Sequence, residues 1–276
     1  VSKFEDLPFL FSEVMQRDWP SYQEAGIRGA TYMHIPTMHW GERTLTQNLF
    51  ARLTRAPERP AAPWIAAYFE RWYGAHARLL RESYALTERA GRYSAQWRAW
   101  AEWSVLSQLL AWDGTSTAQP LRLHEHFADS SAAIAAGRDA LDALGRALEF
   151  VETARQNEKA ARARQAPDPQ RAVNPAELQR YQAGARISKR LAEDGRLLRY
   201  GIDVMELTVA LLKYRNALAE QPNETAAGLW RGIEALADRL EQYVVPIQYA
   251  NPGPGLVLRD ALERSQLGPV VQRCRR

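Results

Sequence analysis

The chain has 276 residues, of which 46% are hydrophobic and 25% charged, and this globular composition excludes a disordered, collagen-like or disulfide-scaffold protein. The net charge is +4, and Arg and Glu are mixed along most of the chain, which argues against a dedicated nucleic-acid binder. Cys274 is the single cysteine, which excludes an internal disulfide, and no apolar run is long enough for a membrane span.

The first 60 residues predict a helix, a strand, a loop and a second helix. Asp6-Leu7-Pro8 is typical of a helix start, and Gly26 fits a helix end with positive φ. Residues 27–35 are short, bounded by Gly and Pro and rich in β-favouring residues, so we expect a strand. Residues 36–42 then form a predicted loop, and Thr44 is the expected N-cap of a helix that ends near residue 55. This alternation is the pattern of an α/β fold.

From Pro60 onward the apolar spacing is helical. The predicted helices cover residues 63–74, 75–90, 94–112, 130–164 with Asp129 or Ser130 as N-cap, 175–218 with interruptions at Gly184, Gly195 and Gly201, and 224–243. Residues 59–245 therefore predict an antiparallel helical bundle, followed by a tail rich in Pro and Gly at residues 246–276. The expected fold class is mainly α.

The residues after the predicted strand form the candidate site, which consists of Tyr32, His34, His39, Trp40 and Glu42. Tyr32 and His34 have the same strand parity, and in α/β barrels ligands meet the side chains at the C-terminal ends of strands. His and Glu side chains transfer protons, and Trp40 offers a flat surface for stacking. The alternative is an ordinary strand and helix start, in which Glu42 only favours the helix N-terminus. Two histidines on either side of Pro36 are too few for a zinc site, so no metal and no cofactor are expected.

Three segments carry a resemblance to a known family: Tyr22–Gly29 (YQEAGIRG), Gln47–Leu53 (QNLFARL) and Trp64–Gly74 (WIAAYFERWYG). They resemble consecutive segments in the later part of the sequences of bacterial glycoside hydrolases related to α-glucuronidases and β-hexosaminidases. The resemblance covers about residues 1–90. It implies that residues 1–58 are the remnant of the end of a TIM-like α/β barrel, and that residues 59–245 are a C-terminal helical domain of unknown function.

The same resemblance implies that the candidate site lies at a sugar-binding mouth. The general acid and nucleophile of such enzymes lie on earlier strands, so the catalytic residues are unknown. The expected partners are a carbohydrate and the rest of the parent chain, and the resemblance suggests a periplasmic or extracellular location. The chain alone should be inactive, since hydrolysis of a glycosidic bond uses two carboxylates that it does not supply.

Two other classes of function stay open. The first is a non-enzymatic helical scaffold, in which the Trp-rich helices form an interface with a partner protein. The second is a basic bundle that binds RNA or DNA, which would require a contiguous Arg face. The stretches Lys159–Arg171 and Arg273–Arg276 are the places where positive charge is concentrated.

Overall fold

The described part of the protein is helical. The structure is a computed structural model that describes residues 12–27, 40–91, 108–109, 121, 123, 127–165, 175–220, 228–236 and 238–240. No strand occurs among these residues, which confirms the prediction of a mainly α fold. The strand predicted over residues 27–35 lies outside the described residues except for Ile27, which has no regular secondary structure.

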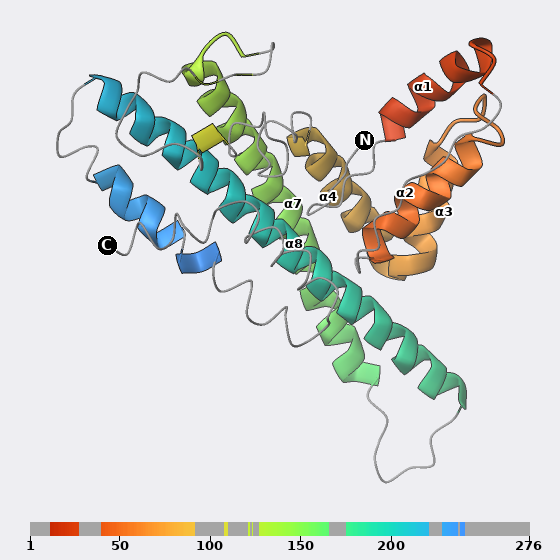
Figure 1. The fold of residues 1–276 in the computed structure, drawn as a ribbon. Helices are drawn as coiled ribbons and strands as arrows, with labels where there is room; N and C mark the ends of the chain where they lie inside the picture. Colours follow the sequence, from red (N-terminus) through yellow and green to blue (C-terminus); the bar gives the residue numbers. More distant parts are fainter. Residues whose placement is uncertain are drawn as a thin grey trace.

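Figure 1 shows the order of the helices along the chain. They are α1 (Ser12–Glu24), α2 (Trp40–Leu53), α3 (Ala62–Tyr73), the 3₁₀ turn η1 (Gly74–His76), α4 (Ala77–Ala90), α7 (Ser130–Gln165) and α8 (Pro175–Glu220). Residues 228–236 and 238–240 are also helical. The helices expected over residues 63–74, 75–90 and 130–164 are thereby confirmed. The helix expected over residues 94–112 is described only at residues 108–109, which are helical.

Helix α1 ends as its sequence predicts. Gly26 has φ of 77°, which a residue with a Cβ rarely adopts. The N–H groups of Gly26 and Ile27 donate to the carbonyls of Gln23 and Tyr22 at 2.9 and 3.0 Å, closing the last turn. Helix α2 differs from the prediction, because it begins at Trp40 and places Thr44 inside the helix rather than at its N-cap.

Helices α3 and α4 are joined by η1 without a loop. Gly74 allows this sharp join with φ of 54°, and its N–H still donates to the carbonyl of Glu70. At the start of α7, the backbone N–H of Ala132 donates to Asp129 Oδ1 at 2.8 Å, so Asp129 is the N-cap that the sequence predicts.

Helices α7 and α8 form a long antiparallel hairpin, and the prediction that glycines interrupt α8 is wrong. Helix α8 runs for 46 residues through Gly184, Gly195 and Gly201. A Cβ on Gly184 would lie 2.7 Å from Glu158 Oε1, and a Cβ on Gly195 would lie 3.2 Å from Glu152 Oε1. These two glycines therefore let α7 approach α8 closely, and the helix tolerates them because packing outweighs a propensity cost of about 1 kcal/mol each.

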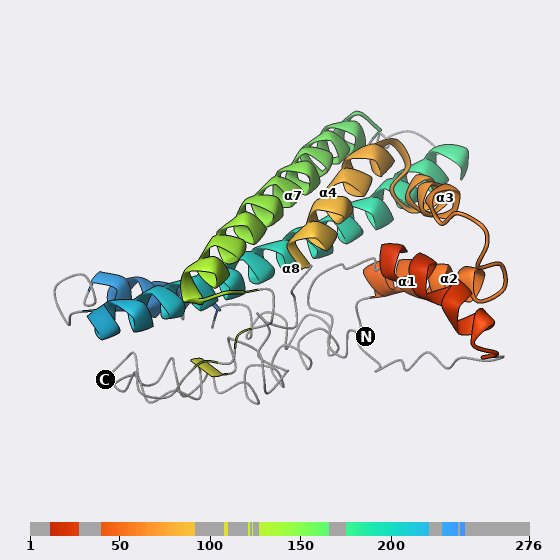
Figure 2. The same cartoon turned by 90° about the horizontal axis from the view of Figure 1, so that it is seen from above.

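One continuous apolar core joins all these helices. Helix α4 packs on α7, α7 packs on α8, and α3 links α4 to α2. Figures 1 and 2 show α1 and α2 beside α3, away from the end of α8 that meets residues 228–240. The largest fully buried side chains come from α2, α3, α4, α7 and α8: Leu49, Leu53, Phe69, Tyr73, Leu80, Tyr84, Leu144, Leu191, Leu198 and Leu207. No helix in the described ranges combines the length and apolar character that crossing a bilayer requires.

Candidate functional site

The residues that the sequence singles out lie at the edge of the described structure. Tyr32, His34 and His39 fall outside the described residues. Trp40 and Glu42 occupy the first turn of α2, so the prediction of a loop is wrong for residues 40–42, whereas residues 36–39 lie outside the described residues. The side chains of Trp40 and Glu42 also lie outside the described part. The helix start thus places two members of the candidate site directly after the segment that holds the other three.

A buried polar cluster lies where α3, α4 and α8 meet. Tyr73 of α3 donates a hydrogen bond of 2.9 Å to Asp194 Oδ2 on α8. Tyr84 of α4 lies 3.4 Å from Asp194 Oδ1 and 3.2 Å from the Tyr73 hydroxyl. All three side chains are buried, with exposed fractions of 3% or less. Three helices from distant parts of the sequence therefore converge on one carboxyl group.

Burial changes the acidity of this carboxyl group. Loss of hydration raises the pKa of Asp194 from 3.8 to about 7, although the hydrogen bond from Tyr73 and the charge of Arg190 act in the opposite direction. Burial beside this carboxyl also raises the pKa of Tyr73 well above its ordinary value. Asp194 is thus a group that gains or loses its proton near neutral pH.

Aromatic side chains enclose the cluster. The ring of Phe69 lies 5.0 Å from that of Tyr84 and 5.6 Å from that of Tyr73. One turn before Asp194, the guanidinium of Arg190 lies 3.9 Å from the centre of the Trp72 ring, a cation–π contact. Since Asp194 is enclosed in this way, the cluster joins helices to one another and does not present its carboxyl group to a substrate.

A second buried polar pair connects η1 to α7. His76 Nε2 lies 2.9 Å from Glu158 Oε2, and both side chains are at least 90% buried. Gly184 provides the space for this glutamate on the α8 side. Ser83 adds a further buried link, since its hydroxyl donates to the carbonyl of Ala147 at 2.9 Å. Buried polar groups without partners are costly, so these pairs specify how α4 and η1 sit on α7.

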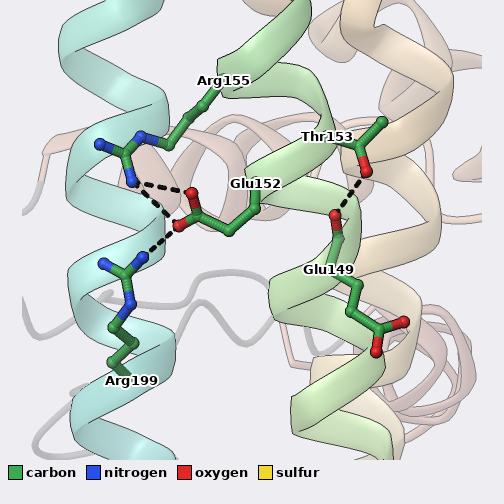
Figure 3. Close-up of polar contacts among 5 residues, drawn as sticks. All are labelled: Glu149, Glu152, Thr153, Arg155 and Arg199. Atoms are coloured by element: carbon green, nitrogen blue, oxygen red, sulfur yellow. Dashed lines mark hydrogen bonds and ion pairs between the residues drawn. The ribbon is translucent and has the colours of Figure 1, made fainter.

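The α7–α8 hairpin also carries a half-exposed ion cluster, shown in Figure 3. Arg155 reaches both oxygens of Glu152 on the same helix at 2.9 and 3.0 Å. Arg199 on α8 also binds Glu152, so two guanidinium groups share one carboxylate. Because this cluster has more positive than negative charge, it leaves a net positive charge on the surface.

The buried cluster was not anticipated from the sequence, although one signal was present. Asp194 lies between Leu191 and Leu198 at the spacing of a buried helix face, so an acidic residue interrupts an apolar stripe. Tyr73 and Tyr84 carry no such signal, since tyrosines at helical spacing are ordinary core residues. Among the described residues, no group of three or more His, Cys, Asp or Glu side chains could hold a metal ion.

Comparison with known proteins identifies no relative. No protein-family model, no curated protein and no solved structure matches the chain.

Proposed function

We propose that this chain is the non-catalytic, sugar-contacting part of a carbohydrate-active, glycoside-hydrolase-like protein, with α3 to α8 as its helical domain. The proposal combines the resemblance of residues 1–90 with one observation on the described helices. Helices α1 and α2 are packed neighbours, with the rings of Trp19 and Phe50 5.2 Å apart, yet 15 residues, 25–39, separate them in sequence.

A connection of this length is long enough to include a strand between the two helices. A simple helix–helix connection in a bundle takes about 2–8 residues, whereas an α/β repeat inserts a strand and two loops between neighbouring helices. Residues 25–39 have the length for a strand with Tyr32 and His34 on one side, followed by a loop with His39. Trp40 and Glu42 would then enter the same mouth from the first turn of α2.

The division of roles follows from the chemistry of these side chains. Trp40 would stack on a sugar face, and His34 and His39 would form hydrogen bonds with hydroxyl groups. The two carboxylates of glycoside hydrolysis would come from the rest of the parent chain. Helices α2 and α3 would hold this sugar site in a fixed position relative to the helical domain, since Leu49, Leu53 and Phe69 are fully buried in one shared core.

A binding experiment tests this proposal. The chain is assayed on aryl glycosides and uronides, where we expect no hydrolysis, and on a glycan array followed by calorimetry with the tightest ligand. Trp40→Ala should weaken binding about 5- to 150-fold, because stacking on an aromatic side chain contributes about 1–3 kcal/mol per ring. Trp40→Phe should retain part of the affinity. Tyr22→Ala is the matched control, since Tyr22 is an exposed aromatic side chain of α1.

Two results would contradict the proposal. Hydrolysis by the chain itself would show that it holds its own catalytic groups. Equal sugar binding by Trp40→Ala and the native chain would remove α2 from the sugar site.

A helical scaffold is the second candidate, and the α7–α8 hairpin favours it. The two helices have 36 and 46 residues, and Figure 1 shows their joined end extending past α3 and α4. Leu178, near that end, is an exposed large apolar residue. A Leu178→Glu variant that abolished binding of a partner protein while leaving sugar binding intact would favour this function.

A further inference from the structure

One edge of the α7–α8 hairpin gathers positive charge from both helices. On α7, Arg155, Lys159 and Arg162 follow at spacings of four and three residues, so they share one face and are about 5 Å apart along the axis. On α8, Lys189, Arg196 and Arg199 follow a nearly heptad spacing. We call these six residues the basic edge.

Contacts between the two helices place both rows on the same side of the hairpin. Arg199 of α8 binds Glu152 of α7, and Arg162 of α7 donates to the Ser188 hydroxyl of α8 at 3.4 Å. The guanidinium of Arg155 also approaches Gly195, since a Cβ there would lie 3.9 Å from its Nη1. Figure 3 shows Arg155 and Arg199 converging between the two helices.

The basic edge lies next to the part of the hairpin that α3 and η1 cover. There His76 of η1 meets Glu158, which lies between Arg155 and Arg162 on α7, and Trp72 of α3 meets Arg190 of α8. Farther along α8, Arg239 binds Asp203 and Glu206, so residues 228–240 cover the continuation of α8 beyond Arg199. Lys159, Lys189 and Arg196 are exposed between these two covered regions.

The charge on this edge exceeds what its carboxylates neutralise. Glu152 is shared by Arg155 and Arg199, and Glu193 lies four residues after Lys189 and three before Arg196, so these two carboxylates offset two of the six positive charges. Arg162 lies over the ring of Tyr181 at 4.9 Å, which fixes its guanidinium through a neutral partner. The α7 row has about one cation per helical turn, and the α8 row has steps of about two turns and one turn, so the edge presents an extended cationic surface that complements an anionic polymer.

We propose that the basic edge binds a linear acidic polysaccharide, one that carries a carboxylate on successive sugar rings. This inference rests on the proposed role in carbohydrate binding and adds the class of glycan and a second contact surface. The alternative polymer, a single-stranded nucleic acid, is bound through stacking of bases on exposed aromatic rings. On the described basic edge the aromatic ring is that of Tyr181, and Arg162 lies over it.

Affinity electrophoresis of the whole chain in gels that contain polygalacturonate tests the proposal. We expect retardation that weakens as salt rises, and none with fully methyl-esterified polygalacturonate, which has the same backbone without the charge. The double variant Lys159→Gln/Arg196→Gln should weaken binding about tenfold at low salt and reduce its salt dependence. Both side chains are exposed, so the variant should keep the native circular dichroism spectrum and melting temperature.

The matched control is Arg138→Gln/Arg146→Gln, which removes the same charge from exposed positions on the N-terminal half of α7. It should bind like the native chain. Equal losses in both double variants would overturn the proposal, since net charge alone would then account for binding. No loss in either variant would also overturn it, since the polymer would then bind elsewhere on the chain. Tighter binding of a single-stranded oligonucleotide of equal charge would also overturn it, in favour of nucleic acid.

This test is separable from that of the proposed function. If Trp40→Ala abolishes sugar binding while Lys159→Gln/Arg196→Gln has no effect on polygalacturonate binding, the proposal for the basic edge is contradicted and the proposed sugar site at Trp40 is supported. If the reverse holds, the hairpin binds acidic glycans without the predicted mouth.

Discussion

Tyr73 donates its hydroxyl hydrogen to Asp194 over 2.9 Å, which connects two residues 121 positions apart in the sequence. This hydrogen bond joins α3, which follows the candidate site in the sequence, to α8 in the long hairpin.

Asp194→Asn should change the pH dependence of stability. In the unfolded chain Asp194 loses its proton near pH 4, whereas in the fold its pKa is about 7, so the native state holds an extra proton between these values. Stability from this group is therefore complete below about pH 4 and is lost as pH rises to about 7. Relative to the native chain, the variant should gain about 4 kcal/mol between pH 4 and pH 8, since one pKa unit is about 1.4 kcal/mol.

Urea unfolding at several pH values measures this difference. The exposed Asp142→Asn on α7 is the control and should show no such trend. A variant that loses stability relative to the native chain as pH rises would mean that the carboxylate is favoured in its charged form by Arg190.

Tyr73→Phe should destabilise the fold by about 1–3 kcal/mol, because it leaves a buried carboxyl group without its best donor. Tyr84→Phe should cost less, since its hydroxyl lies 3.4 Å from the same carboxyl group. Thermal unfolding at pH 6 ranks the two variants. Equal costs would indicate that the two hydroxyls share the carboxyl group equally.

Gly184→Ala should destabilise the hairpin although alanine favours helices. The new Cβ would lie 2.7 Å from Glu158 Oε1 and 3.3 Å from Arg162 Cγ, and Glu158 cannot move without leaving His76. We expect a loss of about 1–3 kcal/mol from this overpacking. Gly145→Ala on α7 has nothing within 4 Å and should stabilise the protein by about 0.5–1 kcal/mol. Stabilisation by both substitutions would contradict the close approach at Gly184.

Arg239→Gln should loosen residues 228–240 from α8. Arg239 binds Asp203 through Nε and Nη2 at 3.2 and 3.0 Å, and Asp203 is buried, so its carboxylate would lose a charged partner. The cost should be about 1–2 kcal/mol, because Arg239 itself is half exposed. Hydrogen exchange should increase in residues 228–240 and not in α4. Arg231→Gln, an exposed position in the same region, should leave the exchange unchanged.

The sequence predicts those helices whose signals are local. Asp129 before an apolar run and Gly26 after one define helix ends through their own backbone and side-chain geometry. The continuity of α8 could not be predicted in this way. Gly184 and Gly195 have poor helix propensity, and the carboxylates that require them belong to another helix more than 25 residues away.

The polar clusters show the same limit for the candidate site. Helical spacing places Asp194 on the buried face of α8, but it does not tell which tyrosines meet it there. At Trp40 and Glu42 a local signal was misleading: Thr44 predicted the helix start, and α2 begins four residues earlier. Their neighbours Tyr32, His34 and His39 remain predictions from the sequence.

The glycine contacts between α7 and α8 also govern which changes of length the hairpin can accept. Gly184 and Gly195 each meet a particular glutamate, so sliding one helix by a single residue would drive both carboxylates into side chains that have a Cβ. Insertions and deletions should therefore be tolerated in the segment that joins the two helices and rejected between these glycines. Homologous chains should accordingly vary in the length of that joining segment and keep the eleven-residue step from Gly184 to Gly195.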